Sequence, residues 1–160
     1  MYNHEPPGYI CPFCLVVQGI ENEHVLTNQG DLIYKDEYIS AFIGAAYWGI
    51  TKGNVIIIPN KHFENIYELP AEYSHRIHDL EKEVALAFKK VYKCDGVSSR
   101  QHNEPDGNQD IWHYHLHVFP RYKDDNLYKT SRELADPVER ARYAKMIRDY
   151  FTEIGLVRKG

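Results

Sequence analysis

The chain has 160 residues, a length that suits one domain with a core large enough to fold without disulfide staples. Its formal net charge of −4 argues against sequence-independent binding to nucleic acid polymers or to anionic membranes, because both require a concentrated basic surface. No apolar run approaches the roughly 18 residues of a membrane span, the N-terminus lacks a secretory signal, and three cysteines do not suit a disulfide framework, so we expect a soluble protein of the reducing cytoplasm.

The first half of the chain alternates turns with apolar runs. Residues 1–30 contain several prolines and glycines and are predicted to form turns and a short helix. Runs of strand length follow at residues 32–34, 38–43 and 54–58. The run from Val55 to Ile58 is β-branched throughout, which favours a central strand covered on both faces.

The second half contains two predicted helices and two predicted strands. Pro70 can occupy the first turn of a helix, and apolar residues recur at helical spacing from there to about Lys93. Strands are predicted at residues 97–101 and 113–119, and a last helix runs from Pro137, capped by Asp136, to Gly155. Because short connections join successive strands, the pattern predicts an α+β fold with a mainly antiparallel sheet of about five strands, one long helix and a C-terminal helix.

Three histidines, His113, His115 and His117, occupy every second position of the predicted strand at residues 113–119. Alternation along a strand would place the rings on one face, about 6.7 Å apart pairwise, with the intervening apolar residues toward the core. Such a row indicates a binding or catalytic surface. It suits metal ligation, or phosphate chemistry in which one imidazole attacks phosphorus and its neighbours donate hydrogen bonds, and the two uses need not exclude each other.

Cys11 and Cys14 have the spacing with which two thiolates bind one tetrahedral zinc ion. A redox pair is the alternative, but the βαβ context of a thioredoxin-like site is missing around them. A zinc site needs two more ligands, and His62 and His113 lie at strand ends that an N-terminal arm could cover. The resulting shell of two cysteines and two histidines has no open position, so such a zinc would be structural.

These residues resemble those of the histidine triad (HIT) family of nucleotide hydrolases and transferases, in particular its zinc-binding members with an N-terminal Cys-x-x-Cys. The family signature, His-x-His-x-His followed by two apolar residues, stands here at residues 113–119. Residues 11–14, 51–53, 55–59, His62 and 64–69 match further segments of the family. The resemblance covers about residues 10–121 and implies a single HIT domain over residues 1–160, with a C-terminal helical extension over about 122–160.

The family mechanism, carried over by resemblance, makes His115 the nucleophile on the α-phosphorus of a nucleoside phosphoramidate or a dinucleoside polyphosphate. A nucleotidyl-histidine intermediate would then pass to water. The resemblance implies that the substrate contacts His117, Gln109 and Asn103, and that zinc binds Cys11, Cys14, His62 and His113. It also implies a homodimer with the long helix near the interface.

Two departures from the family pattern bear on function. Asn54 stands where many members carry a histidine, and it can still donate a hydrogen bond to the substrate. Gly44 stands where members often carry an aspartate that holds the ribose hydroxyls. Both departures would signal lost catalysis in a non-catalytic nucleotide-binding regulatory protein, which is one alternative to hydrolysis at His115. Two others also stay open: a nucleotidyltransferase or phosphorylase with an acceptor other than water, and hydrolysis by zinc bound to the triad itself.

The basic tail and two further residues have two interpretations each. The basic tail beyond Arg121, which includes Arg132, would either cover the pocket and hold polyphosphate or be a solvated surface. Trp48 would either pack in the core or flank a nucleobase. His102 would either join the pocket or turn outward, depending on the alternation along its strand.

Overall fold

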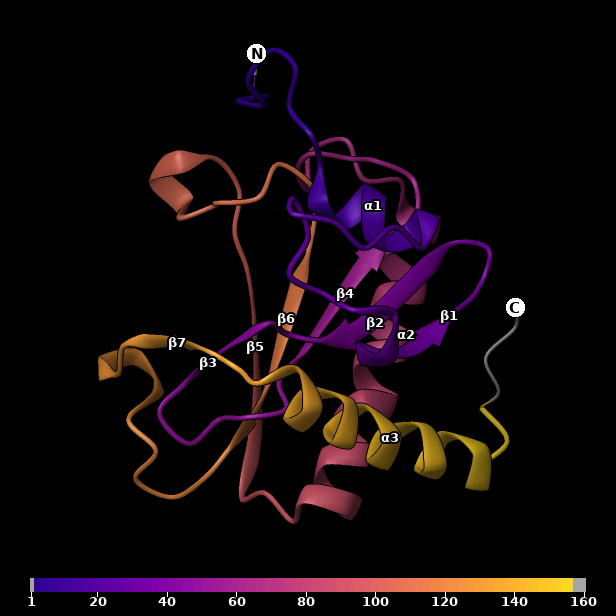
Figure 1. Cartoon of the computed structure of the whole chain (residues 1–160), viewed down its shortest axis with the longest axis vertical. Helices are drawn as coiled ribbons and strands as arrows, with labels where there is room; N and C mark the ends of the chain where they lie inside the picture. The colour runs from indigo at the N-terminus through magenta and orange to yellow at the C-terminus, as the bar shows by residue number, and fades with distance from the viewer. Residues whose placement is uncertain (1, 157–160) are drawn as a thin grey trace.

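The structure of the protein is a computed structural model that describes residues 2–156 (Figure 1). Its main sheet has five strands in the order β1-β2-β4-β6-β5, and all neighbours are antiparallel. Their bounds are β1 Leu32–Lys35, β2 Ile39–Ile43, β4 Val55–Pro59, β5 Gly96–Gln101 and β6 Leu116–Arg121. The predicted α+β fold class is confirmed, and the β-branched strand β4 lies at the centre of the sheet.

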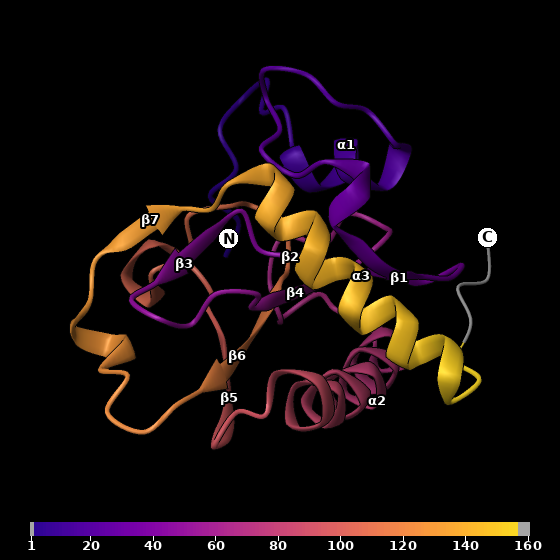
Figure 2. The ribbon, with the colours of Figure 1, turned by 60° about the horizontal axis from the view of Figure 1, so that its bottom comes forward.

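Helices cover both faces of the sheet. The bounds are α1 Pro12–Gln18, α2 Ala71–Ala87 and α3 Pro137–Glu153. Figure 2 shows α1 and α2 on opposite sides of the strands β1, β2 and β4. On the α2 and α3 side, Ile77 and Ile147 pack with Ile57 in one buried cluster, whereas Phe13 of α1 packs with Ile56 in a second cluster. Because alternate residues of a strand face opposite sides, β4 contributes to both clusters.

The helix ends follow local rules, with one deviation. Asp136 caps α3 as predicted, because its side chain accepts hydrogen bonds from the backbone N–H groups of the next turn. Pro70 occupies the N-cap position just before α2, so that helix begins one residue later than the sequence pattern indicates. Its last part, Phe88–Tyr92, is a π-helix that stacks the Phe88 and Tyr92 rings at 5.0 Å, and Lys93 ends it with a left-handed backbone.

The sixth strand begins at Leu116, three residues later than the sequence pattern predicts. The reason lies in the backbone partners of the preceding residues. The His113 N–H donates to the Ile111 carbonyl at 2.9 Å, and the Tyr114 N–H donates to the Phe63 carbonyl at 2.6 Å. Because these partners lie in loops, the two residues do not join the hydrogen-bond pattern of the sheet. Tyr114 and Leu116 nevertheless belong to the core cluster beneath α2. His113 and His115 therefore lie in the loop just before β6, and only His117 lies within the strand.

A two-stranded sheet, β3 Ala46–Trp48 with β7 Arg132–Leu134, is not expected from the sequence. Figure 1 shows it at the left of the main sheet, where β7 returns from the tail to lie beside β3. Tyr47 and Glu133 join the strands by a hydrogen bond of 2.8 Å. Single helical turns at Gln29–Asp31, Pro105–Gly107 and Leu127–Lys129 complete the connections. Within residues 2–156, no helix combines the length and the apolar character needed to cross a membrane.

Candidate functional site

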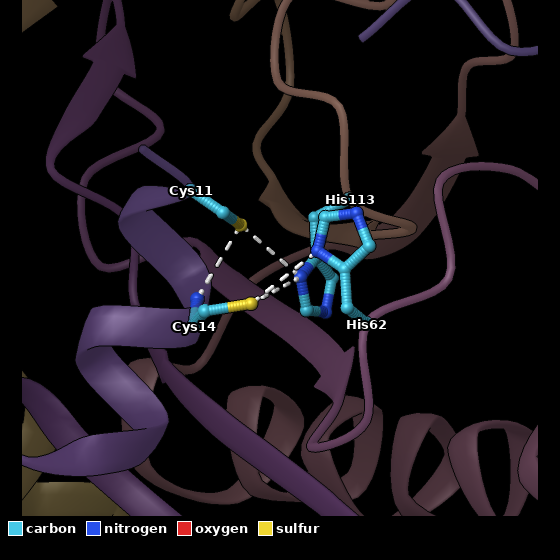
Figure 3. Close-up of side chains that lie close together, drawn as sticks. All are labelled: Cys11, Cys14, His62 and His113. Atoms are coloured by element: carbon cyan, nitrogen blue, oxygen red, sulfur yellow. Dashed lines mark hydrogen bonds between the residues drawn. The ribbon is translucent and has the colours of Figure 1, made fainter. Parts of the chain in front are cut away.

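Two cysteines and two histidines converge where the N-terminal segment lies beside the end of β4 and the start of β6 (Figure 3). Cys11 and Cys14 come from the start of α1, His62 follows β4, and His113 precedes β6. All four ligand atoms lie within 4.8 Å of one another. This cluster is a possible metal site.

The chemistry and spacing of the cluster fit zinc. The His113 Nδ1 atom lies 3.3 Å from Cys11 Sγ and 3.7 Å from Cys14 Sγ, and the His62 Nδ1 atom lies 3.3 Å from Cys14 Sγ. Ordinary Zn–S and Zn–N bond lengths in a tetrahedron place sulfur and nitrogen about 3.6 Å apart. Thiolate and imidazole are also the ligands that zinc prefers in closed sites.

Hydrogen bonds behind the two histidines orient their rings. The Nε2 atom of His62 lies 2.8 Å from the Glu5 carboxylate, and the Nε2 atom of His113 lies 2.9 Å from the Pro59 carbonyl. Because a carbonyl and a carboxylate accept hydrogen bonds, each ring carries its proton on Nε2 and directs the Nδ1 lone pair at the cysteines. The chain before Cys11 is itself fixed, since the buried Glu64 carboxylate accepts hydrogen bonds from the His4 and Glu5 N–H groups.

His115 is not part of this cluster. Its ring is only 2% exposed and packs edge-on against Phe13 of α1 and His117, at centroid distances of 5.3 and 5.0 Å. Its Nδ1 atom donates to the His113 carbonyl at 2.7 Å, so Nε2 carries the lone pair. That Nε2 atom lies 4.0 Å from the Asp110 carboxylate. Burial lowers the pKa of His115, which favours the neutral ring.

A cavity of about 390 Å³ lies against His115 and His117. The N-terminal segment forms one wall, with Phe13 and residues 24–27. A second wall comes from β3, β5 and β7 and carries Trp48 and two arginines, and a third comes from the loops before β6. Polar side chains that line the cavity are His24, Thr27, Asn54, Arg100, His102, Asn108, Asp110, His115, His117 and Arg132. The cavity can hold a small molecule of nucleotide size.

Three buried polar atoms of cavity-lining residues have no hydrogen-bond partner within the described chain: Nδ1 of His117, Oδ1 of Asn54 and Nε of Arg100. Burial, with the charges of His115 and Arg100, holds the pKa of His117 well below its usual value. The Asn54 amide group donates to the Ala46 carbonyl at 2.8 Å. A Cβ atom on Gly44 would lie only 2.4 Å from Asn54 Oδ1. The two departures from the family pattern are therefore linked, because Gly44 leaves the space that the Asn54 side chain occupies.

The structure does not bring Gln109 and Asn103 to the cavity wall. The Gln109 side chain is buried in its own loop, where it donates to the Glu64 and Ile111 carbonyls and accepts from the Glu104 N–H. The Asn103 side chain accepts from the Ile66 N–H and exchanges hydrogen bonds with Gln101. Their placement does not support the expected phosphate contacts, which stay predictions.

Several cavity residues lack an unambiguous signal in the sequence. His102 lines the cavity, so it joins the pocket and does not turn outward. Trp48 lines the cavity and packs against Phe119 at 5.7 Å, and its contact with a nucleobase stays a prediction. Arg132 also lines it, so the tail does contribute to the cavity wall. The sequence does not predict that Arg100 lines the cavity. Its position beside His117 depends on the register between β5 and β6, which the sequence pattern does not reveal.

Comparison with known proteins defines the family. The sequence model described as HIT domain matches residues 25–124. The chain therefore belongs to the histidine triad (HIT) family, as the sequence resemblance indicates. The match begins after Cys14, so the two cysteines of the metal cluster lie outside it.

Two relatives and one solved structure illustrate the similarity. Protein hit of Bacillus subtilis is 29% identical over 112 residues, which cover 70% of this chain and 71% of the relative. The bis(5′-adenosyl)-triphosphatase of Saccharomyces cerevisiae is 27% identical over 97 residues, 60% of this chain and 46% of that protein. A Zn-bound histidine triad family protein from Mycobacterium smegmatis has a TM-score of 0.74 at 23% identity, covering 91% of this chain and 96% of that chain. The shared fold agrees with the predicted architecture.

Proposed function

We propose that the protein hydrolyses nucleotides at the α-phosphate through a covalent intermediate on His115. The observation that carries this proposal is the hydrogen bond from His115 Nδ1 to the His113 carbonyl, which leaves the Nε2 lone pair at the wall of a nucleotide-sized cavity. Membership of a family whose relatives include a bis(5′-adenosyl)-triphosphatase supports the reaction class.

The proposed reaction has two displacement steps. In the first, the Nε2 lone pair of His115 forms a bond to the α-phosphorus while the bond from phosphorus to the leaving group breaks. The leaving atom keeps that electron pair, and an amine leaving group also takes up a proton from solvent. In the second, a water oxygen bonds to phosphorus, the P–N bond breaks, its electron pair returns to Nε2, and the water proton passes to solvent. The rate advantage comes from a nucleophile held in position and from donors around the charged phosphorus.

His117 and Asn54 are proposed to contact the phosphate oxygens. Both side chains line the cavity beside His115. The neutral His117 ring can donate one hydrogen bond from a ring nitrogen, and its unpartnered Nδ1 atom is available for the substrate. The role that the family resemblance assigns to Gln109 and Asn103 would require the loop before β6 to rearrange.

We propose that Cys11, Cys14, His62 and His113 hold a structural Zn²⁺ ion. Four protein ligands fill the tetrahedral shell, so no position is left for an activated water. The ion would instead cross-link the N-terminal segment to the segments that flank β4 and β6. Chelation should therefore lower stability and activity together. If zinc instead acted on the substrate, chelation would stop turnover before it destabilised the fold.

The decisive variant is His115→Ala, with His75→Ala on the exposed surface of α2 as a matched control. Adenosine 5′-phosphoramidate and diadenosine triphosphate are the test substrates, and nucleotide release is measured together with zinc content. We expect turnover to vanish in His115→Ala and to persist in the control. Full turnover in His115→Ala would refute the mechanism, and nucleotide binding without turnover by the unsubstituted protein would favour a regulatory role.

Product analysis separates hydrolysis from transfer. The reaction is run with added inorganic phosphate or sugar phosphate. If the nucleotidyl group is joined to that acceptor and not to water, the protein is a phosphorylase or nucleotidyltransferase. The homodimer and the cytoplasmic location also stay predictions. Light scattering on the purified protein tests the first, and cell fractionation tests the second.

A further inference from the structure

One wall of the cavity carries two arginines that have no anionic partner in residues 2–156. Arg100 lies on β5 directly opposite His117 on β6. Arg132 lies on β7 directly opposite Trp48 on β3. The small sheet and the main sheet therefore bring both guanidinium groups to the same cavity as the histidines.

Arg100 is held in place without being neutralised. Its guanidinium group lies 4.9 Å from the centre of the Trp48 ring and 4.8 Å from the centre of the Phe119 ring. Its Nε atom is buried and has no hydrogen-bond partner among the described residues. Cation–π contact with both rings holds the group beside them, and desolvation lowers its pKa. Within residues 2–156 no carboxylate forms an ion pair with it. A buried donor in this state has a free hydrogen-bonding capacity.

The opposite parts of the cavity have a different character. The N-terminal wall contains the apolar residues Pro12, Phe13, Val25 and Leu26, with His24 and Thr27 as its polar members. Asp110 is the one carboxylate among the described lining residues, and it lies beside His115 Nε2 and makes no ion pair with either arginine. The positive charge is thus concentrated beyond His117, on the side of β3 and β7.

We propose that Arg100 and Arg132 form a subsite for an anionic leaving group, namely the phosphates that follow the α-phosphate in a nucleoside polyphosphate. This inference rests on the proposed function and specifies its substrate class. The guanidinium fork matches phosphate oxygens in pairs, and two such groups exceed what a single α-phosphate beside His115 and His117 requires. When the bond to the α-phosphorus breaks, the leaving phosphate oxygen keeps the electron pair, and the two arginines stabilise that charge.

The test compares two substrates that share the adenylyl group and differ in the leaving group. Diadenosine triphosphate releases ADP, which is anionic, whereas adenosine 5′-phosphoramidate releases ammonia. For Arg100→Gln and Arg132→Gln we expect kcat/KM on diadenosine triphosphate to fall about 10- to 100-fold, the usual effect of losing a hydrogen bond to a charged group. We expect less than about a threefold change on the phosphoramidate. Arg142→Gln, on the exposed side of α3, is the matched control and should alter neither value.

Equal losses on both substrates would overturn the proposal, because the arginines would then support the α-phosphate or the fold. Unchanged values on both would also overturn it. Calorimetry with His115→Ala keeps the subsite testable if the proposed reaction fails. ADP should bind more tightly than AMP to that protein, and Arg100→Gln added to it should abolish the difference. Equal affinity for ADP and AMP with both arginines present would refute the subsite, whether or not the protein has turnover.

Discussion

Replacing Arg140 of α3 by methionine is expected to destabilise the fold by about 3–5 kcal/mol. Arg140 and Asp31 form a buried ion pair of 3.0 Å, with side chains only 5% and 1% exposed. The same guanidinium group donates to the Leu26 and Ala135 carbonyls at 2.8 and 2.9 Å. One side chain therefore joins α3 to the segment before β1 and to the end of β7, which both adjoin the cavity.

The expected size of the effect follows from what the substitution leaves behind. Asp31 would keep its hydrogen bond from the Asn28 N–H but would lose its charge partner, and its Oδ1 atom already has no partner within the described chain. An uncompensated buried carboxylate accounts for most of the penalty, and two carbonyls without donors add to it. For a domain of this size the loss corresponds to a fall in Tm of roughly 6–20 °C.

Thermal and urea unfolding at a fixed zinc concentration measure the loss. The double variant Asp31→Asn with Arg140→Met removes the unpaired charge and should recover about 2 kcal/mol or more relative to the single variant. Arg142→Met, exposed on the same helix, should change stability by less than about 0.5 kcal/mol. A loss below about 1 kcal/mol in Arg140→Met, or no recovery in the double variant, would refute this reasoning.

The pH dependence of the Arg140→Met variant has a defined sign. Burial raises the pKa of Asp31 in the folded protein, and Arg140 partly opposes that shift. Removing Arg140 therefore raises the folded-state pKa further above the unfolded value. The penalty is present above that folded pKa and shrinks as the pH falls through it, because the neutral carboxyl tolerates burial. A penalty that grows on acidification would contradict this assignment.

Three further substitutions test other parts of the account. Glu5→Ala removes the acceptor behind His62 and should weaken Zn²⁺ binding about 10- to 100-fold in chelator competition, with a smaller loss for Glu5→Gln; equal affinities would argue against that role. Gly44→Ala forces a Cβ against Asn54 and should lower stability by about 1–3 kcal/mol in urea unfolding, whereas an unchanged midpoint would show that the side chain can move away freely. Gln109→Ala should lower stability by about 1–3 kcal/mol and leave AMP affinity nearly unchanged. A selective loss of AMP affinity there would restore the phosphate contact expected from the sequence.

The sequence predicts those features that depend on local spacing. The β-branched run of β4 predicts a central strand, and Asp136 followed by Pro137 predicts the start of α3. The metal cluster was predictable for a similar reason. Cys11 and Cys14 begin one short helix, and His62 and His113 flank two strands that pair directly. Antiparallel pairing of β4 and β6 then brings His62 and His113 to the same end of these two strands.

Features that depend on long-range register could not be predicted in the same way. Trp48 and Arg132 pair across 84 positions of sequence, and each of their strands has only three residues, too short for a clear alternation. The proximity of Arg100 to His117 also depends on register, because a shift of one residue would turn the arginine to the other face.

The loop before β6 illustrates a second limit. Glu104 and Asn108 both have positive φ angles, of 63° and 67°, and this backbone turns the Gln109 amide into the loop and away from the cavity. Asparagine tolerates the left-handed region, but glutamate gives no hint of it. Residue type and spacing therefore identify Gln109 as a candidate without revealing where its side chain points.

The covalent intermediate on His115 is the most direct test of the proposed mechanism. Diadenosine triphosphate is mixed with the protein, the reaction is quenched with base within milliseconds, and the protein is digested and mapped by mass spectrometry. We predict an adenylyl group on the peptide that contains His115, with fragmentation placing it on that ring, and none in His115→Ala. Turnover without any adenylylated peptide, or adenylylation at another residue, would contradict the mechanism.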